Sequence, residues 1–102
     1  MSLTLIVTRD VEARYRGFLA SVMPEIAPGV YISTGLSKGV RDRVWRVACD
    51  WWDTSPGASI VMAFPDTNSP GQLGIRALGL PPVELADLDG LRVVVRRVIE
   101  ER

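Results

Sequence analysis

The sequence predicts an α+β fold in which two helices lie on one face of a small sheet. Three observations lead to this prediction. Short apolar, β-branched runs alternate with two segments in which apolar residues recur every three or four positions. The chain has 102 residues, enough for one domain and too few for two. Apolar residues make up 47% of it, which is enough to build one core.

Each element follows from its own pattern. The apolar stripe that starts at Val11 predicts a first helix, with Asp10 as its N-cap and Pro24 at its end. Ser37 is expected to cap a second helix, because the stripe that begins at Val40 follows it. The predicted elements, in order, are strand 3–8, helix 11–23, strand 30–32, helix 38–53, strand 59–64, strand 73–78 and strand 91–99.

The resulting order is β-α-β-α-β-β-β, which is typical of a two-layer, ferredoxin-like sandwich formed by residues 1–102 as a single domain. The last strand follows a Pro81-Pro82 break, a long connection and an expected turn at residues 87–90. That strand therefore has the freedom to pack on a partner chain, or to swap with it, instead of returning to its own sheet.

Composition excludes several classes of chemistry. Histidine is absent, which removes His-based catalytic triads and His-ligated zinc. The single cysteine, Cys49, allows no intrachain disulfide and no paired-cysteine metal site. No apolar run approaches the length of a membrane span, and no basic leader is recognisable. We therefore expect a soluble, cytoplasmic protein that has no membrane partner.

The formal net charge is zero, but basic and acidic side chains are unevenly distributed along the sequence. Residues 9–46 hold seven basic and four acidic side chains, whereas residues 47–90 hold one basic and six acidic side chains. Arg14 and Arg16 flank the apolar stripe near the start of the first helix, where arginine and free backbone N–H groups both favour phosphate. Two interpretations remain open, a phosphate-binding surface and a solvated helix face. The same two interpretations remain open for the basic residues of the second helix, which are Lys38, Arg41, Arg43 and Arg46.

Asp10 is the candidate for metal chemistry. It ends the first strand, where a carboxylate can hold magnesium, and two copies meeting across a dimer axis would pair their carboxylates. The alternative is the helix cap described above. Arg9 is the immediate neighbour of Asp10 and would repel a cation.

Several of these segments occur together in an order and spacing that resembles the CRISPR-associated protein 2 family, in its type I-E branch. The resemblance covers the chain from Met1 to about Ile99. It rests on strand 3–8, Val11, Arg14-x-Arg16-Gly17, Gly29-Val30-Tyr31, Lys38, Val44-Trp45, Ile60-Val61-Met62-Ala63 and Asp87-Leu88-Asp89-Gly90-Leu91-Arg92.

The resemblance implies a ferredoxin-like homodimer that sits between subunits of the CRISPR integrase. Such a complex captures a duplex of foreign DNA, the protospacer, and inserts it into the CRISPR array as a new spacer. By family match, Arg14 and Arg16 fall on the phosphate-binding positions and Lys38 on a third. Residues from about 79 onward become a segment that docks on the integrase, and its expected contacts are Leu85, Leu88, Leu91, Val93 and Val95.

Two departures from the family bear on function. Many relatives are described as magnesium-dependent endonucleases that cut RNA or DNA, but the acidic position of type I-E relatives falls on Arg9 here, and Asp10 comes one residue later. Some relatives carry an arginine pair where this chain has Pro81-Pro82, so part of the DNA track is expected to be either lost or shifted to Arg76. The sequence favours a DNA-holding scaffold. A magnesium-dependent nuclease using Asp10 and a plain protein-interaction module are the alternatives.

Overall fold

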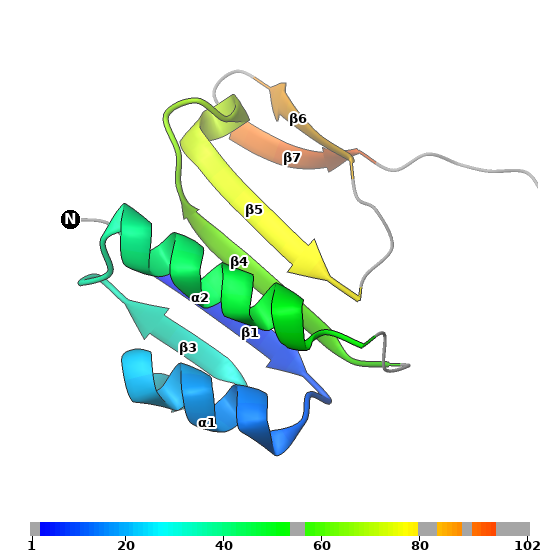
Figure 1. Ribbon diagram of the computed structural model, residues 1–102. Coiled ribbons are helices and arrows are strands. Elements are labelled where there is room, and N and C mark those ends of the chain that lie inside the picture. The colour runs from blue at the N-terminus through cyan, green and yellow to red at the C-terminus, as the bar shows by residue number, and fades with distance from the viewer. Residues whose placement is uncertain (1–2, 54–56, 80–83, 89–90, 96–102) are drawn as a thin grey trace, which may run out of the picture.

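The computed structural model of the protein describes residues 3–53, 57–79, 84–88 and 91–95 (Figure 1). Within these ranges the chain forms seven strands, two α-helices and one short 3-10 helix, η1. The elements are β1 (Thr4–Arg9), α1 (Ala13–Val22), β2 (Glu25–Ala27), β3 (Val30–Ser33), α2 (Lys38–Trp51), β4 (Ser59–Pro65), η1 (Pro70–Gln72), β5 (Leu73–Leu78), β6 (Glu84–Leu88) and β7 (Leu91–Val95).

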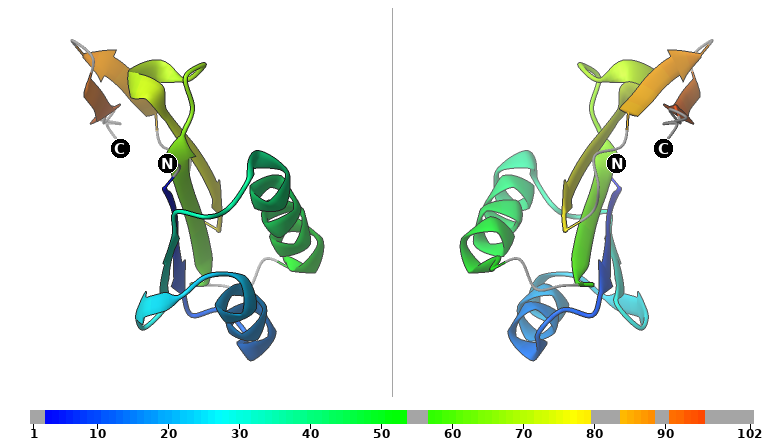
Figure 2. Two further views of the ribbon diagram at one scale, coloured as in Figure 1. Left: turned by 90° about the vertical axis from the view of Figure 1, so that its left-hand side faces the viewer. Right: turned by 90° about the vertical axis from the view of Figure 1, so that its right-hand side faces the viewer.

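Strand β1 lies at the centre of a five-stranded antiparallel sheet in the order β2-β3-β1-β4-β5. Helix α1 connects β1 to β2 and helix α2 connects β3 to β4. Both helices lie on the same face of the sheet (Figure 2). The predicted α+β class is therefore confirmed, and the arrangement fits a ferredoxin-like fold.

The core lies between the two helices and the side of the sheet that faces them. Alternate side chains of a strand point to opposite faces, so Ile6 of β1 and Met62 of β4 both point toward the helices. Ile6 also pairs with Tyr31 of β3, and all three side chains are at most 1% exposed. Complete burial of such a side chain stabilises a fold by about 1.5–3 kcal/mol. The helices complete the core with Tyr15, Leu19, Val44 and Ala48.

Helix α2 begins where the sequence predicts. The Ser37 side chain accepts a hydrogen bond of 3.2 Å from the backbone N–H of Val40, which caps the helix. The predicted stripe needs one correction, because Val40 is 40% exposed whereas Arg41 is only 7% exposed. Residue 41 lies three positions before the buried Val44, on the same side of the helix, so the buried face begins with an arginine.

The prediction that Asp10 caps α1 is wrong. The helix begins at Ala13, and Glu12 occupies the N-cap position without a side-chain cap bond. A cap residue needs an extended backbone, which Glu12 has, whereas Asp10 has a φ of 53° in the left-handed region. Asp10 therefore belongs to the turn that redirects the chain from β1 into α1, and its carboxylate is not used by the helix.

The sequence prediction lacks two of the strands. Strand β2 has three exposed residues and pairs with β3 through an irregular register. Strand β6 contains Asp87 and Leu88, which the sequence predicts as part of a turn, and it pairs with β7 in a separate two-stranded sheet beside η1. Within the described ranges β7 joins β6 and not the five-stranded sheet. Residues 96–99 of the predicted last strand and Pro81-Pro82 lie outside the described residues.

The sheet face opposite the helices is apolar. Val7 of β1 is 39% exposed on this face, and the register places Val30 and Val61 beside it. Leu5 and Ile75 extend the same face on either side through their pairing with Ala63. No helix of the described chain covers this surface (Figure 2). We call it the open sheet face.

Candidate nucleic-acid interface

A hollow of about 340 Å³ lies where β1 ends, and it contains Asp10 and Arg16. Its floor depends on a close contact between β1 and the residue before β3. The backbone N–H of Thr8 donates to the Gly29 carbonyl at 2.7 Å, and the Thr8 hydroxyl donates to the same oxygen at 3.1 Å. Gly29 has a φ of +77°, and a Cβ there would lie 2.8 Å from the Thr8 carbonyl oxygen. Only glycine fits this contact without strain.

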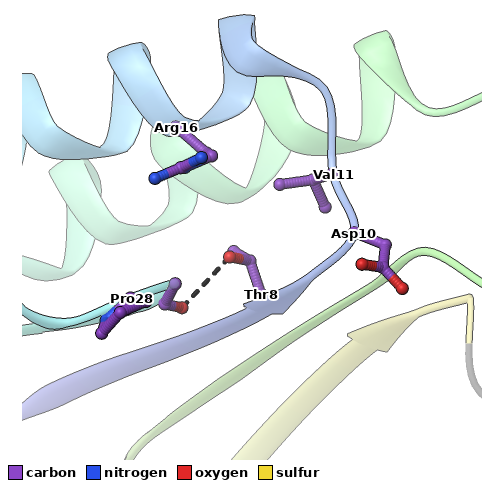
Figure 3. A pocket seen from close by; sticks show the side chains of 6 residues that line it. Thr8, Asp10, Val11, Arg16 and Pro28 are labelled. Carbon is purple, nitrogen blue, oxygen red and sulfur yellow. Dashed lines mark hydrogen bonds between the residues drawn. The ribbon is translucent and has the colours of Figure 1, made fainter.

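Asp10 and Arg16 line this hollow without facing each other. Figure 3 shows Val11 between them, with the Arg16 guanidinium pointing away from Asp10. Both residues are exposed, and among the described residues neither takes part in an ion pair. Burial raises the pKa of the Tyr31 hydroxyl, and the nearby Arg16 guanidinium opposes that rise, so Arg16 has a polar neighbour although it remains exposed.

The same hollow provides little for a magnesium ion. Mg²⁺ prefers an octahedral set of oxygens, usually with one or two carboxylates. Asp10 is the one carboxylate that lines the hollow, and Arg16 adds a positive charge. Across the described ranges, no group of three or more His, Cys, Asp or Glu side chains gathers anywhere. The described residues of a single chain do not fit a complete magnesium site.

Arg14 is held in place by the end of helix α2. Its Nη2 donates to the backbone carbonyl of Trp51 at 3.0 Å, and it lies 3.6 Å from a carboxylate oxygen of Glu12. The guanidinium also lies over the Trp51 ring, 5.2 Å from the ring centroid. The Arg14 side chain nevertheless remains 48% exposed. This geometry fixes the position of the charge and leaves other N–H groups free to contact a ligand.

Trp51 also joins the two helices. Its ring meets Tyr15 edge-on at a centroid distance of 5.5 Å and Phe18 at 5.6 Å. Burial raises the pKa of the Tyr15 hydroxyl, and the charge of Arg14 opposes that rise. Tyr15 is therefore a neutral packing residue. The Trp51 side chain is half-buried, packs against the core and also supports Arg14.

The other two predicted DNA-binding residues, Lys38 and Arg76, line a second hollow of about 350 Å³. Arg76 donates to Asp42 at 2.9 Å, and its guanidinium lies 5.0 Å from the centroid of Phe64. This ion pair joins α2, which carries Asp42, to β5, which carries Arg76. Because Arg76 is paired with Asp42, its positive charge is less available to an external ligand.

The third cation of this second hollow is Arg41, which the sequence places among the basic residues of the second helix without singling it out. Its guanidinium lies 4.0 Å from the centroid of Phe64, and its Nε is buried without a hydrogen-bond partner. Gly74 makes this stacking possible, because a Cβ at that position would lie 2.5 Å from the Phe64 ring. A charged residue in an arginine-rich helix gives no sequence signal of burial, so only the three-dimensional arrangement reveals it.

The predicted phosphate-binding residues therefore form two groups, not one. Arg14 contacts Trp51, the last residue of α2, whereas Lys38 is the first residue of that helix. The 14 residues of α2 rise about 1.5 Å each, which places its two ends about 20 Å apart. Figure 1 shows the start of α1 near the end of α2 and far from its beginning. We call these groups the Arg14/Arg16 site and the Arg41 hollow.

The predicted docking residues lie in the separate two-stranded sheet. Leu85 and Leu88 belong to β6, and Leu91, Val93 and Val95 belong to β7. The register pairs Leu88 with Leu91. This small sheet lies beside η1, at one end of the five-stranded sheet, so the structure places the segment apart from the helix layer (Figure 1).

Neither helix of the described chain has the length and the apolar character that are needed to cross a bilayer. Among known protein families, the one described as CRISPR-associated protein (Cas_Cas2CT1978) matches this chain over residues 3–93. The match includes all seven described strands except the last residues of β7, together with both helices. From this match and the ferredoxin-like arrangement, we conclude that the chain belongs to the Cas2 family of CRISPR-associated proteins.

Proposed function

We propose that the protein is a homodimeric scaffold of CRISPR adaptation, in a type I-E system, which holds duplex DNA by its phosphate backbone. In this role it bridges integrase subunits while a new spacer is inserted. The observation that carries the proposal is the placement of two exposed arginines, Arg14 and Arg16, on helix α1. Arg14 is fixed yet half-exposed, and Arg16 has no ion-pair partner among the described residues.

Backbone contacts of this kind give affinity without sequence preference. Guanidinium groups bind phosphate through paired N–H donors, and each neutralised phosphate releases counterions from the duplex. A site made only of such contacts holds the duplex in position and reads no bases. Since no group of three or more metal-ligating side chains gathers in the described ranges, the arrangement supports holding DNA better than metal-dependent cutting.

The open sheet face supports a second copy of the chain as partner. It presents Val7, Val61 and their neighbours at the centre of a sheet that has no helix on that side. An apolar sheet face of this kind gains stability when a matching face covers it. With two copies, the helix layers point outward, and each carries its own Arg14/Arg16 site. The β6–β7 segment remains the proposed docking site for the integrase.

The test removes both charges of the Arg14/Arg16 site. In the double variant Arg14→Ala/Arg16→Ala, the affinity for a duplex of arbitrary sequence should fall at least tenfold at 0.1 M salt, as an order-of-magnitude expectation, with a shallower salt dependence. Fluorescence anisotropy with labelled duplexes of two unrelated sequences measures this effect.

A matched control is Arg43→Ala/Arg46→Ala, which removes two exposed charges of α2 outside both hollows. This control should retain most of the wild-type affinity. If both double variants bind duplex as tightly as wild type, or if both lose affinity equally, the assignment of Arg14 and Arg16 is wrong.

A second function, magnesium-dependent endonuclease activity, is favoured by one observation. Asp10 is exposed and is not the helix cap, so its carboxylate has no structural role that competes with a catalytic one. Two copies would be needed to bring a second carboxylate to the metal. Cleavage of labelled RNA and duplex DNA, with magnesium and with chelator, tests this function. Under the scaffold proposal Asp10→Asn leaves any residual cleavage unchanged, whereas metal-dependent cleavage that disappears in Asp10→Asn would establish the nuclease.

A further inference from the structure

Tyr31 is a buried tyrosine that lies close to the Arg14/Arg16 site. It belongs to β3, its side chain is 0% exposed, and its ring packs in the core between the helices and the sheet. Its hydroxyl oxygen is also buried and has no hydrogen-bond partner among the described residues. Such a hydroxyl is unfavourable, because it has lost its water and has no other partner. Core packing alone does not explain it, since a phenylalanine ring would fill nearly the same space.

Two charged side chains lie near the Tyr31 hydroxyl. Burial raises the pKa of Tyr31, the negative charge of Glu25 raises it further, and the Arg16 guanidinium opposes the rise. The register places Glu25 directly opposite Tyr31 on the neighbouring strand β2, whereas Arg16 belongs to α1. The surroundings of the hydroxyl therefore contain both a hydrogen-bond acceptor, the carboxylate, and a hydrogen-bond donor, the guanidinium.

The backbone between β2 and β3 fixes the Glu25 carboxylate. Its Oε2 accepts a hydrogen bond of 2.9 Å from the backbone N–H of Gly29. The carbonyl oxygen of Gly29 accepts from Thr8 at the same time, so this peptide is held from both sides. A carboxylate that accepts the proton of a tyrosine hydroxyl leaves the lone pairs of the hydroxyl oxygen free to accept from another donor. Arg16 is the cation whose guanidinium lies nearby to donate.

We propose that Tyr31 is a positioning residue for Arg16, whose guanidinium donates to the Tyr31 hydroxyl while Glu25 orients that hydroxyl. The inference rests on the proposed function, in which Arg16 contacts the duplex. Rotation of the exposed Arg16 side chain forms this bond and gives the buried hydroxyl its partner. Trp51 holds Arg14 in a comparable way. Both guanidinium groups are then fixed before DNA binds, and a fixed side chain loses less conformational entropy on binding than a free one.

A double-mutant cycle tests this role. Tyr31→Phe removes only the hydroxyl and keeps the ring that fills the core, and Arg16→Ala removes the guanidinium. The affinity for a labelled duplex is measured for wild type, both single variants and the double variant. Tyr31→Phe should weaken binding about three- to tenfold, because one flexible arginine must then be ordered on binding. In the Arg16→Ala background the same change should have no effect, because the group that Tyr31 positions is absent.

Tyr15→Phe is the matched control. Tyr15 is 4% exposed, and its hydroxyl is likewise buried without a hydrogen-bond partner among the described residues. Its arginine neighbour is Arg14, whose guanidinium lies 5.5 Å from the centroid of the Tyr15 ring. Whatever the effect of Tyr15→Phe on duplex binding, that effect should be equal in the wild-type and Arg16→Ala backgrounds.

A second measurement needs no DNA. Proton exchange of the Arg16 guanidinium with water is followed by NMR in the free protein. A guanidinium held by a hydrogen bond exchanges more slowly than a free one, so exchange at Arg16 should be slower in wild type than in Tyr31→Phe. Arg43 is the internal reference, because it is exposed on α2, and its exchange should be the same in both proteins.

The outcomes separate the positioning role from the wider function. Coupling between Tyr31→Phe and Arg16→Ala, together with slower exchange at Arg16 in wild type, supports the inference. Equal effects of Tyr31→Phe on binding in both backgrounds overturn it, and so does exchange at Arg16 that Tyr31→Phe leaves unchanged. If wild type binds no duplex, the proposed function fails, and exchange at Arg16 alone decides whether Tyr31 holds the guanidinium.

Discussion

At the scale of single residues, backbone geometry at Gly29 holds the end of β1 against the start of β3. Replacing it with alanine would place a Cβ 2.8 Å from the Thr8 carbonyl oxygen, in a residue with a φ of +77°. We expect Gly29→Ala to lower the free energy of unfolding by about 1–3 kcal/mol, because both the clash and the left-handed backbone are unfavourable for alanine. Urea denaturation measures the change.

Gly17→Ala is the control for that prediction. Gly17 lies within α1, and nothing lies within 4 Å of the position that its Cβ would occupy. Alanine is favoured over glycine in a helix by about 0.5–1 kcal/mol, so this variant should be more stable than wild type. Two glycine-to-alanine changes of opposite sign are the expected result, and a gain in stability from Gly29→Ala would contradict it.

Sequence reasoning at this scale identified which residues carry charge but not how each charge is used. Arg14 and Arg16 are exposed, as the pattern flanking the apolar stripe indicates. The burial of Arg41 could not be predicted, because it depends on stacking against Phe64, a residue distant in sequence whose ring packs closely against Gly74. Asp10 misled the prediction, since aspartate is common both at helix caps and in left-handed turns.

At the scale of elements, the connection between β4 and β5 is built around Asp66. The Ser69 hydroxyl, followed by the Asn68 backbone N–H, holds the pKa of the Asp66 carboxyl below its ordinary value of 3.8. A lowered pKa means that the charged form stabilises the fold above pH 3.8, and this contribution is lost as the pH falls through the folded value. We expect Ser69→Ala to move the pKa of Asp66 back toward its ordinary value, as measured by carboxyl NMR titration.

The control removes a hydroxyl from elsewhere in the chain. Ser21 lies on α1, and its hydroxyl donates to the Phe18 carbonyl of the same helix and not to the β4–β5 connection. Ser21→Ala should therefore leave the titration of Asp66 unchanged. An unchanged pKa in Ser69→Ala would show that the hydrogen bond from Ser69 does not control this carboxylate.

The sequence predicts both helices and four strands of the five-stranded sheet, because each has a clear apolar pattern. These strands are β1, β3, β4 and β5. It does not predict β2, since the three exposed residues Glu25–Ala27 show no alternation. Strand β6 is missed for a different reason. Its sequence contains Glu84 and Asp87, residue types that are depleted in strands, and it follows a Pro-Pro pair. Its extended conformation comes from pairing with β7, and the strand preferences of its own residues do not indicate that pairing.

At the scale of the whole molecule, the open sheet face determines the expected oligomer. Val7 lies at its centre and is 39% exposed. Under the proposed function, Val7→Glu places a charge in an apolar interface and should weaken dimerisation at least 100-fold, as an order-of-magnitude expectation from the cost of burying an unpaired charge. Sedimentation equilibrium at micromolar concentration measures the association.

Val40→Glu is the matched control, because Val40 has nearly the same exposure, 40%, but lies on α2. This variant should remain as dimeric as wild type. A monomeric wild type, or equal association of the two variants, would show that the open sheet face is not the site of dimerisation.

The central position of β1 has a consequence for how the chain acquires its structure. Ile6 pairs with Tyr31 on one side but with Met62 on the other, so the second neighbour of the first strand is synthesised much later. Contacts between residues so distant in sequence slow folding, because a long loop must close before they form. During translation one edge of β1 remains unpaired until β4 has emerged, and an unpaired strand edge is a template for association with other chains. Nascent chains that stop before β4 should therefore depend on the ribosome or on chaperones to remain free of aggregates.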